Sequence, residues 1–259
     1  MSKLRESLAS GKFTFTGEIG PPKGINIEPV FQMVCRDRNR LALQSDLLSA
    51  AVFGIENVLA LTGDHIVMGD HQDAKGVYDL DSVGLLRAMS KLEEGTDMGV
   101  DMKGNPNTLD GAPTFFKGCC VTPCAPTPDA QAIKLERKVE AGAQFAVTQP
   151  VYDEASAQVL REATRHAGIP IIMGILPLRT PRHAEFLHQR VAGIAVPQAV
   201  RERMERASDP VAEGAANARE MLRVAREGFR GACLMPPFGH YEVVGDVLGD
   251  GGGREFGDS

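Results

Sequence analysis

The chain has few of the residues that make nucleic-acid-binding surfaces. Its 259 residues contain no tryptophan and three tyrosines, and 34 acidic residues outnumber 28 basic ones, for a net charge of −6. A protein that follows a phosphate backbone needs a basic surface, and one that binds single strands also needs exposed aromatic rings. The composition therefore argues against a nucleic-acid partner.

Long apolar runs are also missing. No stretch of the sequence reaches the roughly 20 apolar residues of a membrane span. The first residues, MSKLRESLASGK, lack the apolar centre of a secretory signal. We therefore expect a cytoplasmic protein without membrane contact.

The cysteines do not form a metal-binding pattern. There are five of them, an odd number. Cys119, Cys120 and Cys124 cluster, but they contain no CxxC pair and have no histidine at ligand spacing. We interpret them as small buried apolar residues and predict no metal site.

Strand-like and helix-like segments alternate along the chain. Helical patterns such as 81–92 and 154–167 separate short apolar runs, which is typical of a parallel α/β fold. The predicted strands are 12–19, 29–35, 58–61, 115–121, 144–148, 170–176 and 231–235, with 193–196 as a short eighth. At this length the pattern predicts a (β/α)8 TIM-type barrel in one domain over residues 1–250. The glycine-rich tail 251–259 is predicted to be disordered.

Polar residues close several of these strands. They are Glu18, Gln32, Asp64, Thr122 and Gln149. The carboxyl ends of parallel strands open onto one face, so these side chains are expected to share a site. Gly63 would let a ligand approach the backbone closely. Taken singly, Glu18 and Gly63-Asp64 could equally be turn residues.

Six motifs, in order, resemble the methylenetetrahydrofolate reductase family. They are FTGEIGPPKG, FQMVCRDRNRLALQSDLL, NVLALTGDH, AKGVYDLDSVGLL, LERKVEAGAQFAVTQPVYD and GIPIIMGILPL. Members of that family are flavin-dependent barrels. They pass a hydride from NADH or NADPH through FAD to 5,10-methylene-tetrahydrofolate, giving 5-methyl-tetrahydrofolate for one-carbon metabolism and methionine biosynthesis. The resemblance thus implies FAD, a reduced nicotinamide and a folate substrate.

The resemblance also implies roles for single residues. Glu18 is similar to the catalytic acid that protonates the folate nitrogen, which requires a carboxyl pKa raised by burial. Asp64 resembles the aspartate near the flavin that stabilises the cationic iminium. Gln149 matches a residue that hydrogen-bonds the pterin ring, and His183 loosely matches a substrate position. The positions that would contact the flavin are Gln32, Leu61, Thr62, Gly63, Asp64, Tyr78, Arg137 and Lys138, the last two at its diphosphate.

One strand–helix unit of the family is absent from this chain. Residues 24–27 directly join segments that a strand and a helix separate in the family. A parallel crossover needs about a dozen residues or more, so 20–29 cannot hold one. We therefore expect a barrel made incomplete or distorted by this loss. The unpaired strand edges beside the gap would favour a homo-oligomer or an electron-donor partner protein.

Two other functions stay open. The chain could be a flavin-deficient barrel homologue that acts as a subunit or an inactive remnant. It could also be an aldolase or lyase that uses Glu18 and Lys138, although no lysine closes a strand to form a Schiff base. The yellow colour of bound flavin would distinguish the first function from both.

Overall fold

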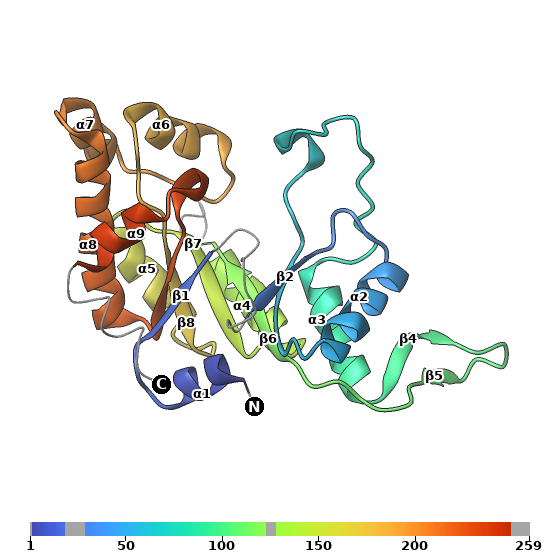
Figure 1. The fold of residues 1–259 in the computed structure, drawn as a ribbon. Helices are drawn as coiled ribbons and strands as arrows, with labels where there is room; N and C mark the ends of the chain where they lie inside the picture. The colour runs from blue at the N-terminus through green and yellow to red at the C-terminus, as the bar shows by residue number, and fades with distance from the viewer. Residues whose placement is uncertain (1, 19–28, 123–127, 250–259) are drawn as a thin grey trace. The chain divides into compact units, whose positions relative to one another are not determined.

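The computed structural model describes residues 2–18, 29–122 and 128–249 and shows an α/β fold (Figure 1). Seven strands are hydrogen-bonded in the order β1-β9-β8-β7-β6-β3-β2. Their bounds are β1 Thr14–Gly17, β2 Val30–Val34, β3 Asn57–Leu61, β6 Phe116–Val121, β7 Phe145–Pro150, β8 Ile171–Ile175 and β9 Gly231–Leu234. The pairs β1–β9, β8–β9, β2–β3 and β3–β6 are parallel. The predicted parallel sheet and its seven main strands are confirmed.

Strands β1 and β2 stand at the two ends of this order. Within the described ranges, neither pairs with a second strand of the sheet. A closed barrel has no such ends. The prediction of an incomplete TIM-type barrel is therefore confirmed. The short connection at 24–27 and the tail 251–259 lie outside the described residues.

The chain divides into two compact units. Unit 1 comprises Met1–Glu6, Asn26–Cys120 and Ile133–Ala146, and unit 2 comprises Ser7–Ile25, Val121–Ala132 and Val147–Ser259. The boundary passes through helices α1 (Lys3–Ala9) and α4 (Pro128–Glu140) and through strands β6 and β7. The assignment of residues 1–250 to one catalytic domain stays a prediction.

Unit 1 contains two capped helices and a hairpin besides its strands. The side chain of Asn39 caps α2 (Arg40–Val52) by accepting a 3.0 Å hydrogen bond from the Ala42 amide. Asp81 caps α3 (Ser82–Glu93) in the same way at the Gly84 amide, at 2.7 Å. Further elements are the N-terminal helix α1 (Lys3–Ala9), the 3-10 turn η1 (Ile66–Met68) and the hairpin β4 (Thr96–Val100) with β5 (Pro106–Thr108). The hairpin extends beyond α3 in Figure 1, and its two strands were not among the predicted ones.

A buried ion pair ties β6 to α3. The Lys117 side chain is 8% exposed, and its ammonium group lies 2.5 Å from a Glu93 carboxylate oxygen. It also donates a 2.9 Å hydrogen bond to the hydroxyl of Ser90, which donates to the carbonyl of Ala141. The other Glu93 oxygen accepts from the Phe115 amide at 2.8 Å. A buried charge is tolerated here because these partners satisfy it.

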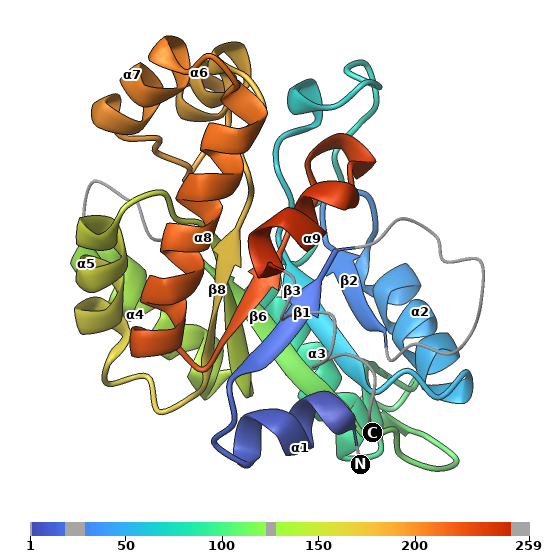
Figure 2. The same cartoon turned by 60° about the vertical axis from the view of Figure 1, so that its left-hand side comes forward.

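The core of unit 2 lies between its strands and a long helix. Helix α8 (Pro210–Gly228) packs Met221 and Ala225 against Met173 of β8 and Ala232 of β9. Helix α5 (Glu154–Thr164) runs beside α8 (Figure 2). The remaining elements are α6 (Pro181–Arg190), α7 (Gln198–Arg206), the 3-10 turn η2 (Pro237–Gly239) and α9 (Glu242–Leu248).

The predicted short strand at 193–196 was wrong. Residues 193–196 form a turn and an irregular segment, and Gly193 has a φ of +82°. Ile194 and Val196 are buried against α6 and α7 instead of a sheet. A side chain at Gly193 would come within 2.6 Å of Thr122, so the chain turns in close contact with the end of β6. Helix packing buried this apolar run as completely as a sheet would have done.

Candidate functional site

In unit 1 the end of β3 is fastened to the start of α3. The Thr62 hydroxyl accepts a 3.0 Å hydrogen bond from the Ser82 amide and donates to the Ser82 hydroxyl at 3.2 Å. Leu61 is the last strand residue and is half-buried. Thr62 therefore has a positioning role that the resemblance did not imply.

Gly63 occupies a position that no other residue fits. Its φ is +90°, a conformation that residues with a side chain rarely adopt. A Cβ atom there would collide with Cγ1 of Val34 and lie 2.9 Å from Cβ of Arg36. The space beside Gly63 is thus filled by Val34 and Arg36, and the close approach of a ligand to this backbone stays a prediction.

The loop after Gly63 folds back onto Asp64. The carbonyl oxygen of Asp64 accepts a 2.8 Å hydrogen bond from the Tyr78 hydroxyl and a 3.5 Å one from the guanidinium of Arg36. Arg36 also binds the Asp37 carboxylate at 2.7 and 2.9 Å, and this hydrogen bond is the largest of the effects that lower the pKa of Asp37. The Asp64 side chain is exposed. Tyr78, at a φ of 44°, and Asp64 are thus brought together.

The other flavin-contact candidates of unit 1 lie on β2 and α4. Gln32 is exposed in the middle of β2, opposite Leu59 of β3. Arg137 is exposed in the last turn of α4, whereas Lys138 is half-buried and donates a 2.6 Å hydrogen bond to the carbonyl of Cys120. The ammonium group of Lys138 therefore lies close to the carboxyl end of β6.

In unit 2 Glu18 and Gln149 occupy strand ends. The Glu18 amide donates a 3.0 Å hydrogen bond to Leu234, so β1 stays paired with β9 up to this residue. Glu18 is exposed, whereas the role implied by the resemblance requires a buried carboxyl group. Gln149 is half-buried at the end of β7, and its carbonyl accepts a 2.7 Å hydrogen bond from the Thr148 hydroxyl.

Thr148 also fixes the neighbouring strand. Its hydroxyl accepts a 2.8 Å hydrogen bond from the amide of Gly174 in β8. A Cβ atom at Gly174 would lie 2.5 Å from the Thr148 carbonyl oxygen, so the two strands approach too closely for a side chain. The end of β7, and with it Gln149, is held by this contact.

His183 is buried in the first turn of α6. Its amide donates to the Thr180 hydroxyl at 3.0 Å, and its Nδ1 atom accepts from the Arg179 amide at 3.4 Å. The imidazole lies 5.1 Å from the Phe238 ring, centroid to centroid. Burial, and then the positive charge of Arg179, lower the pKa of His183 below its ordinary 6.5.

This lowered pKa predicts a specific dependence of stability on pH. Because the folded state favours neutral His183, its contribution is complete above pH 6.5 and is lost as pH falls towards the folded pKa. In urea unfolding between pH 5 and 7, His183→Gln should lose less stability on acidification than the parent. The difference is limited to about 1.4 kcal/mol per pH unit for one proton. His188→Gln, at an exposed position of the same helix, should behave like the parent. Parallel curves for the parent and His183→Gln would contradict the assignment.

The predicted site residues thus fall into two groups. Unit 1 holds Gln32, Leu61, Thr62, Gly63, Asp64, Tyr78, Arg137 and Lys138, and unit 2 holds Glu18, Gln149 and His183. The common site that would join the two groups stays a prediction. Sequence reasoning missed Arg179, Thr148, Gly174 and Phe238.

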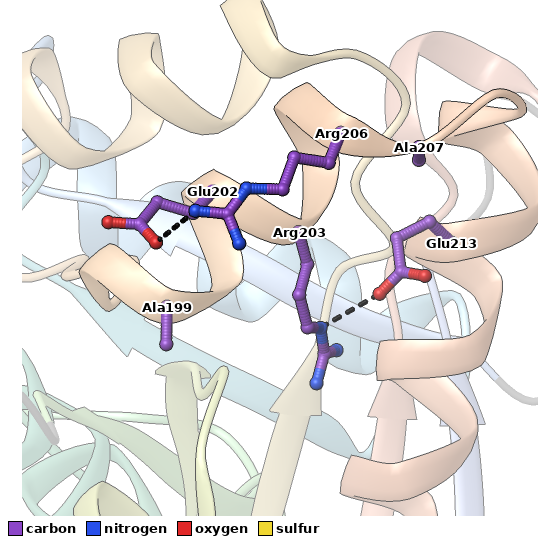
Figure 3. A pocket seen from close by; sticks show the side chains of 6 residues that line it. All are labelled: Ala199, Glu202, Arg203, Arg206, Ala207 and Glu213. Atoms are coloured by element: carbon purple, nitrogen blue, oxygen red, sulfur yellow. Dashed lines mark hydrogen bonds and ion pairs between the residues drawn. The ribbon is translucent and has the colours of Figure 1, made fainter.

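A hollow of about 470 Å³ in unit 2 contains none of these residues (Figure 3). Its lining consists of Ala199, Glu202, Arg203, Arg206, Ala207 and Glu213. Arg203 pairs with Glu213 at 2.8 Å and Arg206 with Glu202 at 3.0 Å. Exposed pairs of this kind are typical of a solvated helix surface.

The described residues contain neither a metal-ligand cluster nor a membrane-spanning helix. Among residues 2–18, 29–122 and 128–249, no three histidine, cysteine, aspartate or glutamate side chains are placed to hold a metal ion. In the same ranges, every helix is too short or too polar to span a bilayer.

Residues 22–231 match the family described as methylenetetrahydrofolate reductase. The chain belongs to the methylenetetrahydrofolate reductase family. It is 27% identical over 188 residues to methylenetetrahydrofolate reductase 2 of Schizosaccharomyces pombe, covering 70% of this chain and 28% of that protein. It is 29% identical over 161 residues to the 5,10-methylenetetrahydrofolate reductase of Salmonella typhimurium, covering 61% of this chain and 47% of that protein. The matches to these curated relatives therefore span less than half of their length.

One solved structure shares the fold of this family member over most of its length. It is described as an uncharacterized protein from Clostridium thermocellum that binds two copies of 5-methyl-5,6,7,8-tetrahydrofolic acid. The TM-score is 0.54 at 13% identity, with 95% of this chain and 96% of that chain covered. At this identity the likeness concerns the fold.

Proposed function

We propose that this chain reduces 5,10-methylene-tetrahydrofolate to 5-methyl-tetrahydrofolate with FAD and a reduced nicotinamide, NADH or NADPH. The observation that carries the proposal is the placement of Asp64 three residues after the end of β3, next to the positive-φ Gly63, within the family motif LTGDH. The family match over residues 22–231 supports the reaction class.

The flavin would bind to residues of unit 1. Its ring would lie against Leu61, Asp64 and Tyr78, of which the last two are joined by the hydrogen bond from the Tyr78 hydroxyl to the Asp64 carbonyl. The cations of Arg137 and Lys138 would pair with the diphosphate. FAD, when bound, would accept and deliver the hydride.

The chain's own side chains would handle the folate. Glu18 would give its proton to the bridging nitrogen, and the C–N bond then breaks to leave an iminium ion that accepts hydride. The Asp64 carboxylate would stabilise that cation. Gln149, held by Thr148, would hydrogen-bond the pterin ring.

The test is flavin reduction and reoxidation by the purified full chain. Protein incubated with FAD and desalted should be yellow, and anaerobic NADH or NADPH should bleach it. Added methylene-tetrahydrofolate should then restore the colour and yield methyl-tetrahydrofolate. Colourless protein would contradict the proposal in favour of a flavin-deficient homologue. Bleached protein that folate does not reoxidise would contradict the proposed substrate.

A further inference from the structure

Helix α2 is apolar on two opposite faces. Its inner face consists of Leu43, Leu47 and Ala50, all of which are buried. On the opposite side of the helix, Leu41 is 74% exposed and Val52 is 84% exposed. A surface helix has one apolar stripe and a polar face opposite to it, whereas a helix that is apolar all round is covered on all sides. The outer face of α2 is therefore expected to be covered by another polypeptide.

The outer face of α2 has the spacing of a coiled-coil seam. Successive residues of this face are four, three and four positions apart, and they are Leu41, Ser45, Leu48 and Val52. We call these four residues the α2 seam. Leu48 is half-buried, and the other three are exposed. A seam with this spacing packs best against a second helix that has the same spacing, because the side chains of each helix then fit between those of the other.

The neighbours of α2 within unit 1 leave the α2 seam open. Helix α3 packs beside α2 (Figure 1). The hairpin is also attached to α2, because the Gln44 side chain accepts a 2.8 Å hydrogen bond from the Met98 amide of β4. Strand β2, which precedes α2, stands at the end of the strand order, and among the described residues only β3 pairs with it. None of these elements covers Leu41 or Val52, which stay exposed beside them.

The α2 seam is complementary to a second copy of itself. When two α2 helices lie antiparallel about a two-fold axis, Leu41 of each copy meets Val52 of the other, and Ser45 meets Leu48. Each larger side chain then faces a smaller one, so the two seams interdigitate without leaving a cavity. A parallel pair would instead place Ser45 against Ser45 and leucine against leucine, which packs less well. The sequence of the seam thus favours an antiparallel pair of identical helices.

The charges around α2 favour the same antiparallel arrangement. Arg38 and Arg40 lie at the start of α2, whereas its last turn carries no basic residue. Arg38 pairs with Asp46 and Arg40 with Asp79, and the two arginine side chains remain 51% and 46% exposed. In the antiparallel pair they lie near the carboxyl end of the other copy's helix, where a cation is favourable. Arg40 also approaches the ring of Phe53, which is 82% exposed.

We propose that the α2 seam is a homodimer interface, through which two copies of this chain pair with their α2 helices antiparallel. One pair of 13-residue helices buries a modest area, so the dimer is expected to dissociate with a Kd of about 1–100 µM. The seam contains none of the residues assigned to flavin or folate. The proposal therefore goes beyond the reductase function, and its test requires neither ligand.

Sedimentation equilibrium of the full chain at about 1–200 µM tests the interface. The parent should be dimeric at the upper concentrations. Leu41→Glu and Val52→Glu should each raise the dimer Kd about a hundredfold or more. The two-fold axis places each change in the interface twice, and every buried unpaired charge costs about a factor of ten or more.

A double variant tests the antiparallel arrangement. In Leu41→Glu/Val52→Lys each glutamate meets a lysine of the other copy, so the dimer should re-form with a Kd within about tenfold of the parent's. Within one chain the two positions are roughly 16 Å apart along the helix, too far to pair with each other. Leu41→Glu/Val52→Glu is the matched control and should stay monomeric.

Met102→Glu controls for the added charge. Met102 is a fully exposed apolar residue in the hairpin of the same unit, and its replacement should leave the dimer Kd unchanged. Because Leu41 and Val52 are exposed in the single chain, circular dichroism should show that all variants remain folded.

Three results would overturn the proposal. A parent that is monomeric at the highest concentration would leave the outer face of α2 to a different protein. A dimer that Leu41→Glu and Val52→Glu do not weaken would use another surface. Single variants that dissociate without recovery in Leu41→Glu/Val52→Lys would contradict the antiparallel pairing. Dissociation by both single variants, recovery by the double variant and an unchanged Met102→Glu together support the interface.

Discussion

Replacing Gly63 by alanine is expected to lower the free energy of unfolding by about 3 kcal/mol and to weaken FAD binding about a hundredfold. The new methyl group would meet Val34 and Arg36 and would also sit at a φ of +90°. Relief requires the strand end to move, which displaces Asp64. Urea unfolding measures the first effect, and FAD titration of the apoprotein measures the second.

Gly54→Ala is the matched control for crowding. Gly54 has a φ of +76°, but a Cβ atom there would meet nothing within 4 Å. The control carries the backbone penalty without the collision and should lose about 1 kcal/mol while FAD binding is unchanged. Equal losses in the two variants would show that the contacts with Val34 and Arg36 do not determine the effect.

Glu18→Gln should slow one half-reaction of the catalytic cycle and leave the other unchanged. Glutamine cannot donate the proton that opens the folate ring, and removing a general acid costs about a hundredfold to ten-thousandfold in rate. Reoxidation of the flavin by methylene-tetrahydrofolate should therefore fall by about a thousandfold. Reduction by NADH or NADPH needs no such proton and should keep its rate. Anaerobic stopped-flow measurement of each half-reaction separates the two.

An exposed glutamate of the same unit provides the control for Glu18. Glu205→Gln, on α7, changes the net charge equally and should leave both half-reactions intact. If Glu18→Gln reoxidises at the parental rate, the acid must be another group, and the role implied for Glu18 is wrong.

The main strands could be predicted because burial on both faces leaves a clear sequence pattern. Val58 to Ala60 are all buried, and the sequence shows them as one apolar run. Helices α1 and α9, with seven residues each, carry too little periodicity to be recognised. Hairpin β4–β5 is largely polar and only partly buried, so nothing distinguishes TDMGV and PNT from a loop.

The site could be predicted where it depends on the order of residues and not where it depends on geometry. Asp64 and Gln149 are visible because a polar residue interrupts an apolar run. Phe238 is hidden because Pro-Pro-Phe-Gly reads as an ordinary turn, and its φ is a property of the fold. The buried Nε atom of Arg179, from which no described residue accepts a hydrogen bond, likewise appears only with coordinates. Gly174 did leave a signal, since an isolated glycine within a strand often marks a close backbone approach.

The Lys117 ion pair restricts which alignments of β6 are acceptable. Sliding β6 by one position would turn the ammonium group to the opposite face and bring Phe116 or Gly118 opposite Glu93 and Ser90. A misaligned strand would separate the Lys117 ammonium group from the Glu93 carboxylate, a penalty that purely apolar side chains would not impose. Strand β6 and helix α3 must also come together before that charge is neutralised, so partly assembled forms of unit 1 are destabilised. The ion pair thereby favours the native register of β6 while unit 1 assembles.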